Sequence, residues 1–192
     1  MGLQAGVHNL PFIPVLGFMH SDLMKVRRDL KTVRDPYSGN EYVVVLPVIP
    51  DVAIIHAAKG SRNGEITTDA TRNDRLLAMA AKKTIAVVEE LVEPEDVLPG
   101  RQEVFVASVH IDAVVLAPGG AHPTGCPRIY ETDAAHIREY VAASKDEQGL
   151  AAYMEKYIFA PEDHDRYLEV VNFRGGNSGS STSGNRSGRK QL

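Results

Sequence analysis

The hydrophobic pattern of the chain alternates between short apolar runs and polar segments with helical spacing. Runs rich in β-branched residues predict strands covered on both faces, as in a mostly parallel sheet; they are Asp51 to Ala57, Thr84 to Leu91 and Ile111 to Ala117. Residues 71–83 between the first two runs have an apolar face at helical spacing, with Thr71 or Asn73 as cap. A strand, crossover helix and strand of this size form a right-handed parallel unit, so the carboxyl ends of the three strands should share one edge.

The segments on either side of this centre are shorter. Leu10 to Phe18 is apolar and extended between prolines, and no element is predicted for Met1 to Asn9, so we expect part of the fold to lie upstream. Ser21 can cap a short helix that runs to Arg28. Lys31 to Pro47 predicts a hairpin, and Asn63-Gly64 predicts a tight turn before a short extended segment.

The last third of the chain is predicted to be helical and then disordered. Apolar stripes at helical spacing predict helices over Thr132 to Ser144, Glu147 to Phe159 and Pro161 to Val171. Residues 173–192 are rich in Gly and Ser, with almost nothing to bury. The expected organisation is one α/β domain over residues 1–172, doubly wound with flanking helices, and a disordered tail over residues 173–192.

Composition excludes several classes of partner. The 192 residues carry a net charge of −4, so the chain offers no basic field to nucleic acid or an anionic membrane. Cys126 is the single cysteine, which excludes an internal disulfide and favours a reducing compartment. No run approaches the roughly 20 apolar residues of a membrane span, and no signal peptide is visible. We therefore expect a cytoplasmic protein.

The candidate site is the loop that follows the third predicted strand. Pro118 ends the strand, Gly119 and Gly120 permit close approach of a ligand, and His122-Pro123 stiffens the exit. In an open α/β sheet ligands bind beyond the carboxyl ends of strands, where a Gly-Gly loop can offer backbone N–H groups to an oxygen atom. The alternative interpretation is a simple tight turn.

Three further residues at the same predicted edge are candidates for a functional role. His56 lies inside an apolar strand, where it is either a satisfied core histidine or part of a site wall. Glu89 and Glu90 are adjacent in a strand, so one of them should face inward; that residue would suit acid, base or nucleophile chemistry, or an ion pair at a contact between subunits. Cys126 has no basic residue visibly placed to activate it and is expected to be inert.

The familiar cofactor motifs are missing from the sequence. It contains neither a Gly-rich nucleotide fingerprint nor a nucleophile elbow. No pair of histidines or cysteines has metal-ligand spacing, so no metal site is expected. The histidines weighed for this were His56, His110, His122, His136 and His164.

An ordered set of segments resembles the alpha (A) subunit of family I CoA-transferases, most closely the glutaconate CoA-transferase type. The matching stretches, in order, are LPFIPV, DVAIIHA, AAKKTIAVVEELV, IDAVVLAPGGAHPTGC and APEDHDRYLEVV. The resemblance implies a doubly wound α/β subunit that pairs with a B subunit, with the active site between them. It also implies that a usual strand-helix-strand region with a Gly-rich loop is missing before Met1.

The resemblance further implies a reaction in which a glutamate on the B subunit performs the attack on an acyl-CoA thioester and CoA moves between two carboxylic acids. No catalytic residue is then expected in this chain, the CoA thioester is a substrate, and no cofactor is permanently bound. The residues expected to contact substrate are His56, Gly119, Gly120, Ala121 and His122. Two alternatives remain open: a ring-opening acyl-CoA hydrolase subunit of steroid breakdown, and a truncated subunit without catalytic activity.

Overall fold

The structure is a computed structural model that describes residues 1–174. Residues 175–192, which hold most of the predicted disordered tail, lie outside the described residues. The chain divides into two compact units, residues 1–120 and residues 121–192, and each is described by itself. Among the described residues, each helix is too short or too polar to cross a bilayer.

The first unit contains two sheets and three α-helices. Its elements are α1 (Gly2–Val7), β1 (Ile13–Val15), α2 (Leu23–Val26), β2 (Lys31–Arg34), β3 (Glu41–Val45), β4 (Ala53–Gly60), β5 (Ile66–Asp69), α3 (Asp74–Ala80), β6 (Thr84–Leu91), β7 (Glu103–Val106) and β8 (Ala113–Leu116), with single 3₁₀ turns η1 (Pro94–Asp96) and η2 (Ser108–His110). The second unit is helical; its elements are α4 (Ala134–Ala143), α5 (Glu147–Met154), the π-helical turn η3 (Glu155–Phe159) and α6 (His164–Val170).

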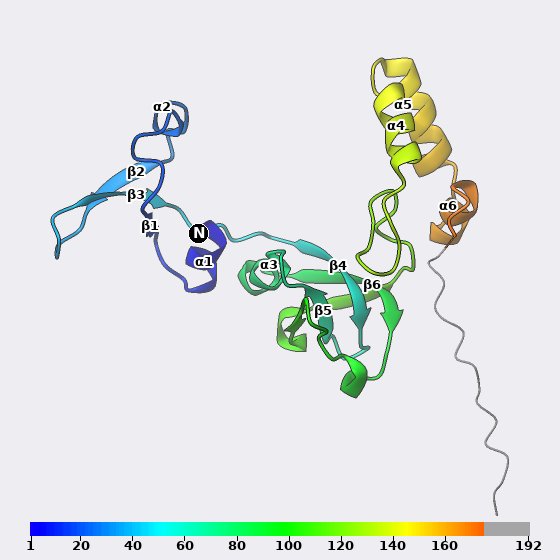
Figure 1. Ribbon diagram of the computed structural model, residues 1–192, viewed down its shortest axis with the longest axis horizontal. Coiled ribbons are helices and arrows are strands. Elements are labelled where there is room, and N and C mark those ends of the chain that lie inside the picture. The colour runs from blue at the N-terminus through cyan, green and yellow to red at the C-terminus, as the bar shows by residue number, and fades with distance from the viewer. Residues whose placement is uncertain (175–192) are drawn as a thin grey trace, which may run out of the picture. The chain divides into compact units, whose positions relative to one another are not determined.

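The five-stranded sheet has the order β7-β5-β4-β6-β8. Its strands β4, β5 and β6 are labelled in Figure 1. β4 pairs in parallel with β6, and β6 pairs in parallel with β8, as the apolar runs predicted. β5 and β7 are antiparallel additions on the other side of β4, the first reached through the tight turn at Asn63-Gly64. The α/β class is confirmed, and the sheet is mixed because a short hairpin extends its parallel half.

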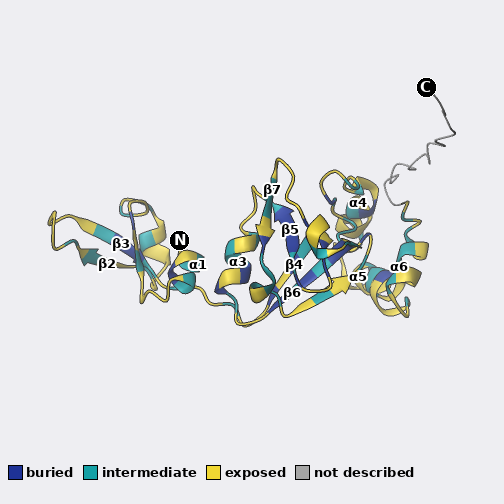
Figure 2. Ribbon diagram, turned by 90° about the horizontal axis from the view of Figure 1, so that it is seen from below, coloured by how far each residue is buried: buried dark blue, intermediate teal, exposed yellow. Residues whose placement is uncertain are grey.

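One face of this sheet holds the core of the unit. Buried positions alternate along β4 and β6, as the dark segments in Figure 2 show. Their side chains pack in one cluster with Ala78 of α3; the cluster is Ile55, Ala57, Ile66, Ala78, Ala86, Val88 and Val106. The other face of β4 and β8 is less covered, since Ile54 is 70% exposed and Val115 46% exposed. The burial expected on both faces is therefore complete on the α3 face, whereas the opposite face is covered only in part, at positions such as Glu89.

The predicted hairpin is present, and β1 adds a third strand to it. β2 and β3 pair antiparallel, and β1 lies on the free side of β3, so the sheet order is β1-β3-β2. The proline-flanked segment Leu10 to Phe18 thus supplies an edge strand of three residues, as its prolines allow. The helix predicted from Ser21 is reduced to α2, which begins after Asp22.

Helix α1 was not predicted, and its glycines explain both the miss and its packing. Gly lowers helix propensity by about 1 kcal/mol relative to Ala, so the segment looks irregular in sequence. A Cβ at Gly2 would come within 2.7 Å of Val48 Cγ2, and one at Gly6 within 2.5 Å of the Val48 carbonyl oxygen. Tertiary contact with residues 46–49 therefore selects glycine in a segment that is nevertheless helical.

The second unit confirms the three predicted helices and corrects their ends. α4 and α5 begin where the side chains of Asp133 and Asp146 accept backbone N–H groups. The third helix starts at His164 rather than in the turn of Pro161, because Asp163 caps it by accepting the Arg166 N–H. Beyond α5, the predicted helix continues to Phe159 as the π-helical turn η3.

Candidate functional site

The three parallel strands end at one edge of the sheet. His56 on β4 lies opposite Val87 on β6, and Val87 lies opposite Val115 on β8. The chain leaving β8 stays attached to this edge, since the Ala117 N–H donates to the Val88 carbonyl at 2.9 Å. The Gly-Gly loop therefore follows the same edge as the ends of β4 and β6, which is the placement on which the sequence argument depended.

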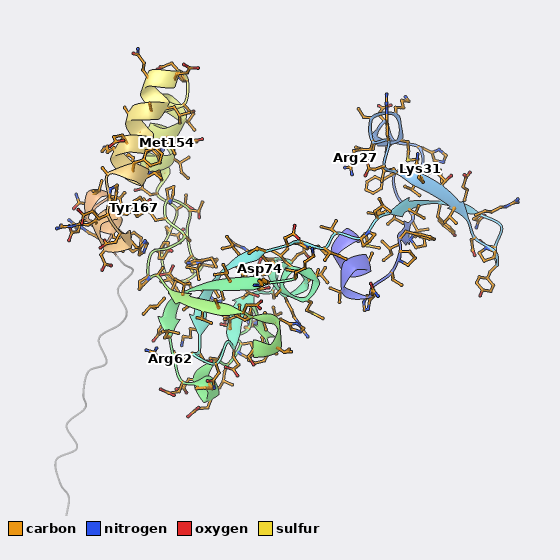
Figure 3. All side chains as sticks on the ribbon, turned by 180° about the vertical axis from the view of Figure 1, so that it is seen from behind. Arg27, Lys31, Arg62, Asp74, Met154 and Tyr167 are labelled. Carbon is orange, nitrogen blue, oxygen red and sulfur yellow. The ribbon has the colours of Figure 1, made fainter. Side chains whose placement is uncertain are left out.

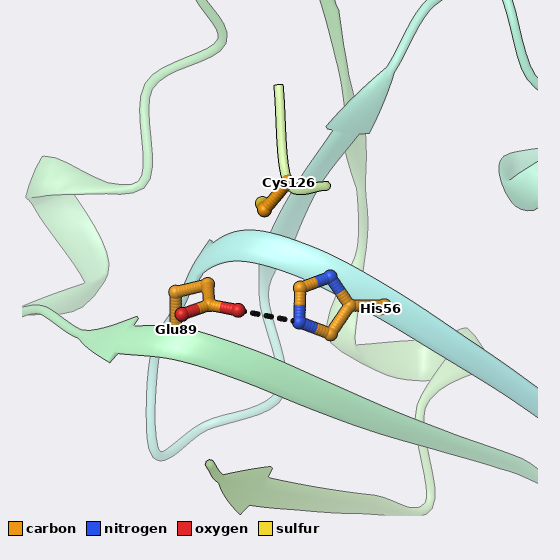
Figure 4. Close-up of side chains that lie close together, drawn as sticks. All are labelled: His56, Glu89 and Cys126. Atoms are coloured by element: carbon orange, nitrogen blue, oxygen red, sulfur yellow. Dashed lines mark ion pairs between the residues drawn. The ribbon is translucent and has the colours of Figure 1, made fainter. Parts of the chain in front are cut away.

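Glu89 is the buried acidic group at this edge. Its side chain is 5% exposed, and its two carboxylate oxygens have different partners. Oε2 accepts the Gly119 N–H at 2.6 Å, and Oε1 lies 2.7 Å from His56 Nε2 (Figure 4). The contact with His56 is an ion pair by distance, but its direction falls outside hydrogen-bond geometry. Glu89 on β6 thus contacts β4 through His56 and the loop that follows β8 through Gly119.

The two adjacent glutamates face different surroundings, as the alternation of a strand requires. Glu89 lies on the same face as His56, opposite the face that packs on α3. Glu90 is exposed, and its carboxylate is 4.0 Å from Lys59 Nζ, a contact worth little in water. The prediction that one of the pair faces inward is confirmed, and the residue is Glu89.

The glycines of the loop are required by its geometry. Gly119 has φ +75°, in the left-handed region that costs other residues about 1–2 kcal/mol. A Cβ on Gly120 would lie 2.8 Å from the Ala117 carbonyl oxygen and 3.3 Å from Val87 Cγ1. The Gly119 N–H donates to Glu89 and the Gly120 N–H to Ala117 at 2.9 Å. Both N–H groups therefore donate to acceptors within the chain. The loop can offer a ligand a close approach to its small glycines, but not these two hydrogen-bond donors.

Ala121 and His122 belong to the second unit. The Ala121 N–H donates to the Tyr130 hydroxyl at 2.9 Å. His122 Nδ1 lies 2.6 Å from the Tyr167 hydroxyl, and Nε2 lies 3.4 Å from Asp133 Oδ2. The side chain of His122 is 5% exposed, so within this unit its ring serves as an interior polar group.

Electrostatics around His122 follow from capping and burial. The pKa of Asp133 is lowered chiefly because its carboxylate accepts the His136 N–H at the start of α4. Burial raises the pKa of Tyr167 to about 12, so its hydroxyl stays protonated at neutral pH. Tyr167, labelled in Figure 3, is therefore a neutral hydrogen-bond partner of His122.

Comparison with known proteins identifies the family. The family model described as coenzyme A transferase matches residues 3–117, which include β4, β6, β8 and Glu89. The chain belongs to the coenzyme A transferase family. This confirms the resemblance drawn from the ordered sequence segments.

Named relatives of this transferase-family chain have more than one activity. The alpha-type (A) subunit of glutaconate CoA-transferase from Acidaminococcus fermentans is 34% identical over 185 residues, covering 88% of this chain and 58% of the relative. The cholesterol ring-cleaving hydrolase IpdA subunit of Rhodococcus jostii is 31% identical over 172 residues, covering 84% of this chain and 58% of the relative.

A solved structure agrees with the sequence comparison. The crystal structure of glutaconate coenzyme A-transferase from A. fermentans matches with a TM-score of 0.79 and 32% identity, over 89% of this chain and 59% of that chain. The transferase-family chain spans less than two thirds of the length of the curated relatives that it matches.

The sequence located the strands of the site but not the contacts within it. The link from Glu89 to His56 and Gly119 depends on strand register, which apolar runs do not specify. The signal available was an acidic residue inside a buried strand, two residues beyond the position that pairs with His56. The sequence also did not predict that Asp133 lies close to His122. The position of Asp133 directly before a helix indicates only that it can cap that helix.

Proposed function

We propose that this chain forms part of the alpha-type (A) subunit of a CoA-transferase that moves CoA between two carboxylic acids. A partner B subunit would provide the glutamate that attacks the acyl-CoA thioester and then carries CoA as a glutamyl thioester. The observation that carries the proposal is the match to glutaconate coenzyme A-transferase, at 32% identity and a TM-score of 0.79. The cytoplasmic location expected from the sequence is part of the same proposal.

The environment of Glu89 supports a nucleophile outside this chain. One oxygen of its carboxylate accepts the Gly119 N–H and the other faces His56. A nucleophilic carboxylate needs an open oxygen in contact with the thioester carbon. Glu89 is instead suited to hold the loop against β6, so we assign it a positioning role and assign no catalytic residue to this chain.

The proposed substrate contacts keep the expected residues and change their roles. His56 and the Gly119-Gly120 turn would form a wall for the acyl group, where the small glycines permit close approach. Ala121 and the backbone of His122 are proposed as contacts further along the same loop, since the His122 ring is held inside the second unit. CoA acts as a thioester substrate with no permanently bound cofactor, and its remote binding energy would drive a weak carboxylate nucleophile towards the transition state.

Co-expression with a B-type partner tests this proposal. The complex is incubated with an acyl-CoA, treated with hydroxylamine or borohydride, and each chain is analysed by mass spectrometry. We expect label on a glutamate of the B-type partner, together with CoA transfer that requires an acceptor acid. Glu89→Gln should reduce kcat, whereas the matched Glu90→Gln should not. Label on Glu89, or label on neither chain, would overturn the assignment; the second result would support a non-catalytic role for this chain.

A hydrolase is the second candidate, because the IpdA subunit of a cholesterol ring-cleaving hydrolase is 31% identical over 84% of this chain. The two activities differ in their need for an acceptor. A transferase releases CoA from an acyl-CoA only when it passes CoA to another acid, whereas a hydrolase uses water. Free CoA formed without an acceptor acid, together with a ring-opened product from a cyclic acyl-CoA, would favour the hydrolase.

A further inference from the structure

The second unit brings together three side chains with metal-ligand chemistry. His122, Asp133 and His136 each offer one ligand atom, and these atoms all lie within 4.8 Å of one another. The spacing of histidines along the sequence predicted no metal site. The three meet because His122 lies in the loop before α4, Asp133 caps that helix and His136 follows in its first turn.

The distance between His122 and Asp133 suits a shared cation better than a direct hydrogen bond. His122 Nε2 is 3.4 Å from Asp133 Oδ2. A charge-assisted N–H···O bond is about 2.7–2.9 Å long. Two ligands on one tetrahedral Zn²⁺, at about 2.0–2.2 Å from the ion, are about 3.3–3.6 Å apart. The observed separation matches the second arrangement.

The outer contacts of both histidines follow the pattern of metal-binding imidazoles. His122 uses Nδ1 towards the Tyr167 hydroxyl at 2.6 Å, which leaves Nε2 directed to Asp133. His136 is 6% exposed, and its Nε2 lies 2.7 Å from the Tyr153 hydroxyl. A metal-ligating histidine usually has its second nitrogen held by a hydrogen-bond partner, which fixes the orientation of the ring.

The charges and the surroundings also favour a cation. Asp133 Oδ1 accepts two N–H groups of α4, so the cap occupies one oxygen and Oδ2 is the one that faces His122. The rings of His122 and His136 pack edge to face, with centroids 5.0 Å apart. Imidazole and carboxylate together suit zinc and other divalent first-row metals, and three protein ligands leave one position for water.

We propose that His122, Asp133 and His136 form a binding site for a divalent first-row cation, with Zn²⁺ as its probe. The site would fix the loop before α4 to the first turn of that helix. Binding uses neutral imidazoles and an ionised carboxylate, so any proton on His122 Nε2 or the bound His136 nitrogen leaves to solvent when the metal enters.

Calorimetric titration of the untagged full chain with Zn²⁺ tests the site. We expect one Zn²⁺ per chain. Binding should be at least about tenfold weaker in Asp133→Asn, which loses the charge of its carboxylate ligand, and in His136→Gln, which loses an imidazole ligand. Asn is as good a helix cap as Asp, so Asp133→Asn removes the ligand charge while keeping the start of α4. His20→Gln, which changes an exposed histidine of the first unit, should bind as tightly as the unaltered chain.

A second variant and a spectrum separate a metal site from a hydrogen-bond network. Tyr167→Phe removes only the outer hydroxyl and should weaken Zn²⁺ binding about 10- to 100-fold. Co²⁺ added to the unaltered chain should give the visible absorption of a four- or five-coordinate ion. Fewer than one Zn²⁺ per chain, equal affinity in Asp133→Asn and His20→Gln with unchanged circular dichroism, or six-coordinate Co²⁺ spectra would each overturn the proposal.

Discussion

Substitution of Gly60 by alanine tests how tightly the end of β4 is packed. Gly60 is the last residue of β4, directly beside the candidate edge, and it pairs with Leu91 on β6. An added Cβ would lie 2.8 Å from Val88 Cγ1 and 3.1 Å from Ile66 Cγ2. Val88 and Ile66 are fully buried and β-branched, so neither can turn away without disturbing the core.

The expected cost follows from overpacking. Forcing one methyl group into a packed core costs about 1–3 kcal/mol. With a urea m-value of about 1–3 kcal/mol per molar, the unfolding midpoint of Gly60→Ala should fall by about 1 M at unchanged m. The measurement is urea unfolding followed by far-UV circular dichroism, which reports the loss of secondary structure.

Gly17→Ala is the matched control for this experiment. A Cβ at Gly17 would meet no atom within 4 Å, so the substitution tests the same chemical change in open space. Both variants reduce the entropy of the unfolded chain by a similar amount, and the difference between them isolates the steric cost. If Gly60→Ala is as stable as Gly17→Ala, the proposed packing at the end of β4 is wrong.

Three other substitutions probe separate contacts. Glu89→Ala removes the acceptor of the Gly119 N–H and should lower the free energy of unfolding by about 1–3 kcal/mol. The control Glu90→Ala changes an exposed residue and should alter that free energy by less than about 0.5 kcal/mol, as measured by chemical denaturation of both variants. Asp163→Ala removes the cap of α6 and should cost about 0.5–2 kcal/mol by the same method, with neighbouring Glu162→Ala near zero. The pKa of Glu139 is lowered chiefly by hydrogen bonds from the Tyr157 hydroxyl and Lys156. The contribution of Glu139 to the free energy of unfolding is therefore present above its unfolded pKa of 4.5 and is lost as the pH falls through the folded value. Glu139→Gln should be less stable than the unaltered chain at pH 7 and equally stable in acid.

The sequence was most informative where local chemistry alone decides the structure. β6 occupies the predicted range, Thr84 to Leu91, because β-branched residues and a polar boundary agree on it. The hairpin was also predicted, since Asp35-Pro36 and Gly39 mark its turn. α1 escaped prediction because Gly2 and Gly6 are selected by a distant segment, residues 46–49, and not by helix propensity.

The candidate site was predictable only in outline. The edge shared by three strand ends follows from the rule for parallel units, and it located His56, Glu89 and the Gly-Gly turn together. The partners of Glu89 depend on register and on the left-handed backbone of Gly119, which no local pattern encodes. The same holds for His122 and Tyr167, which lie in contact although 45 residues separate them.

The mixed topology of the five-stranded sheet has a consequence for the order of folding. β4 and β5 join through the short loop of residues 61–65, whereas β6 and β8 reach their places only after residues 61–83 and 92–112 have been closed into loops. Closing a longer loop has a larger entropic cost, so the hairpin should nucleate the sheet and the parallel strands should dock on it later. The candidate edge would then gain protection against hydrogen exchange later than the β4-β5 hairpin during refolding.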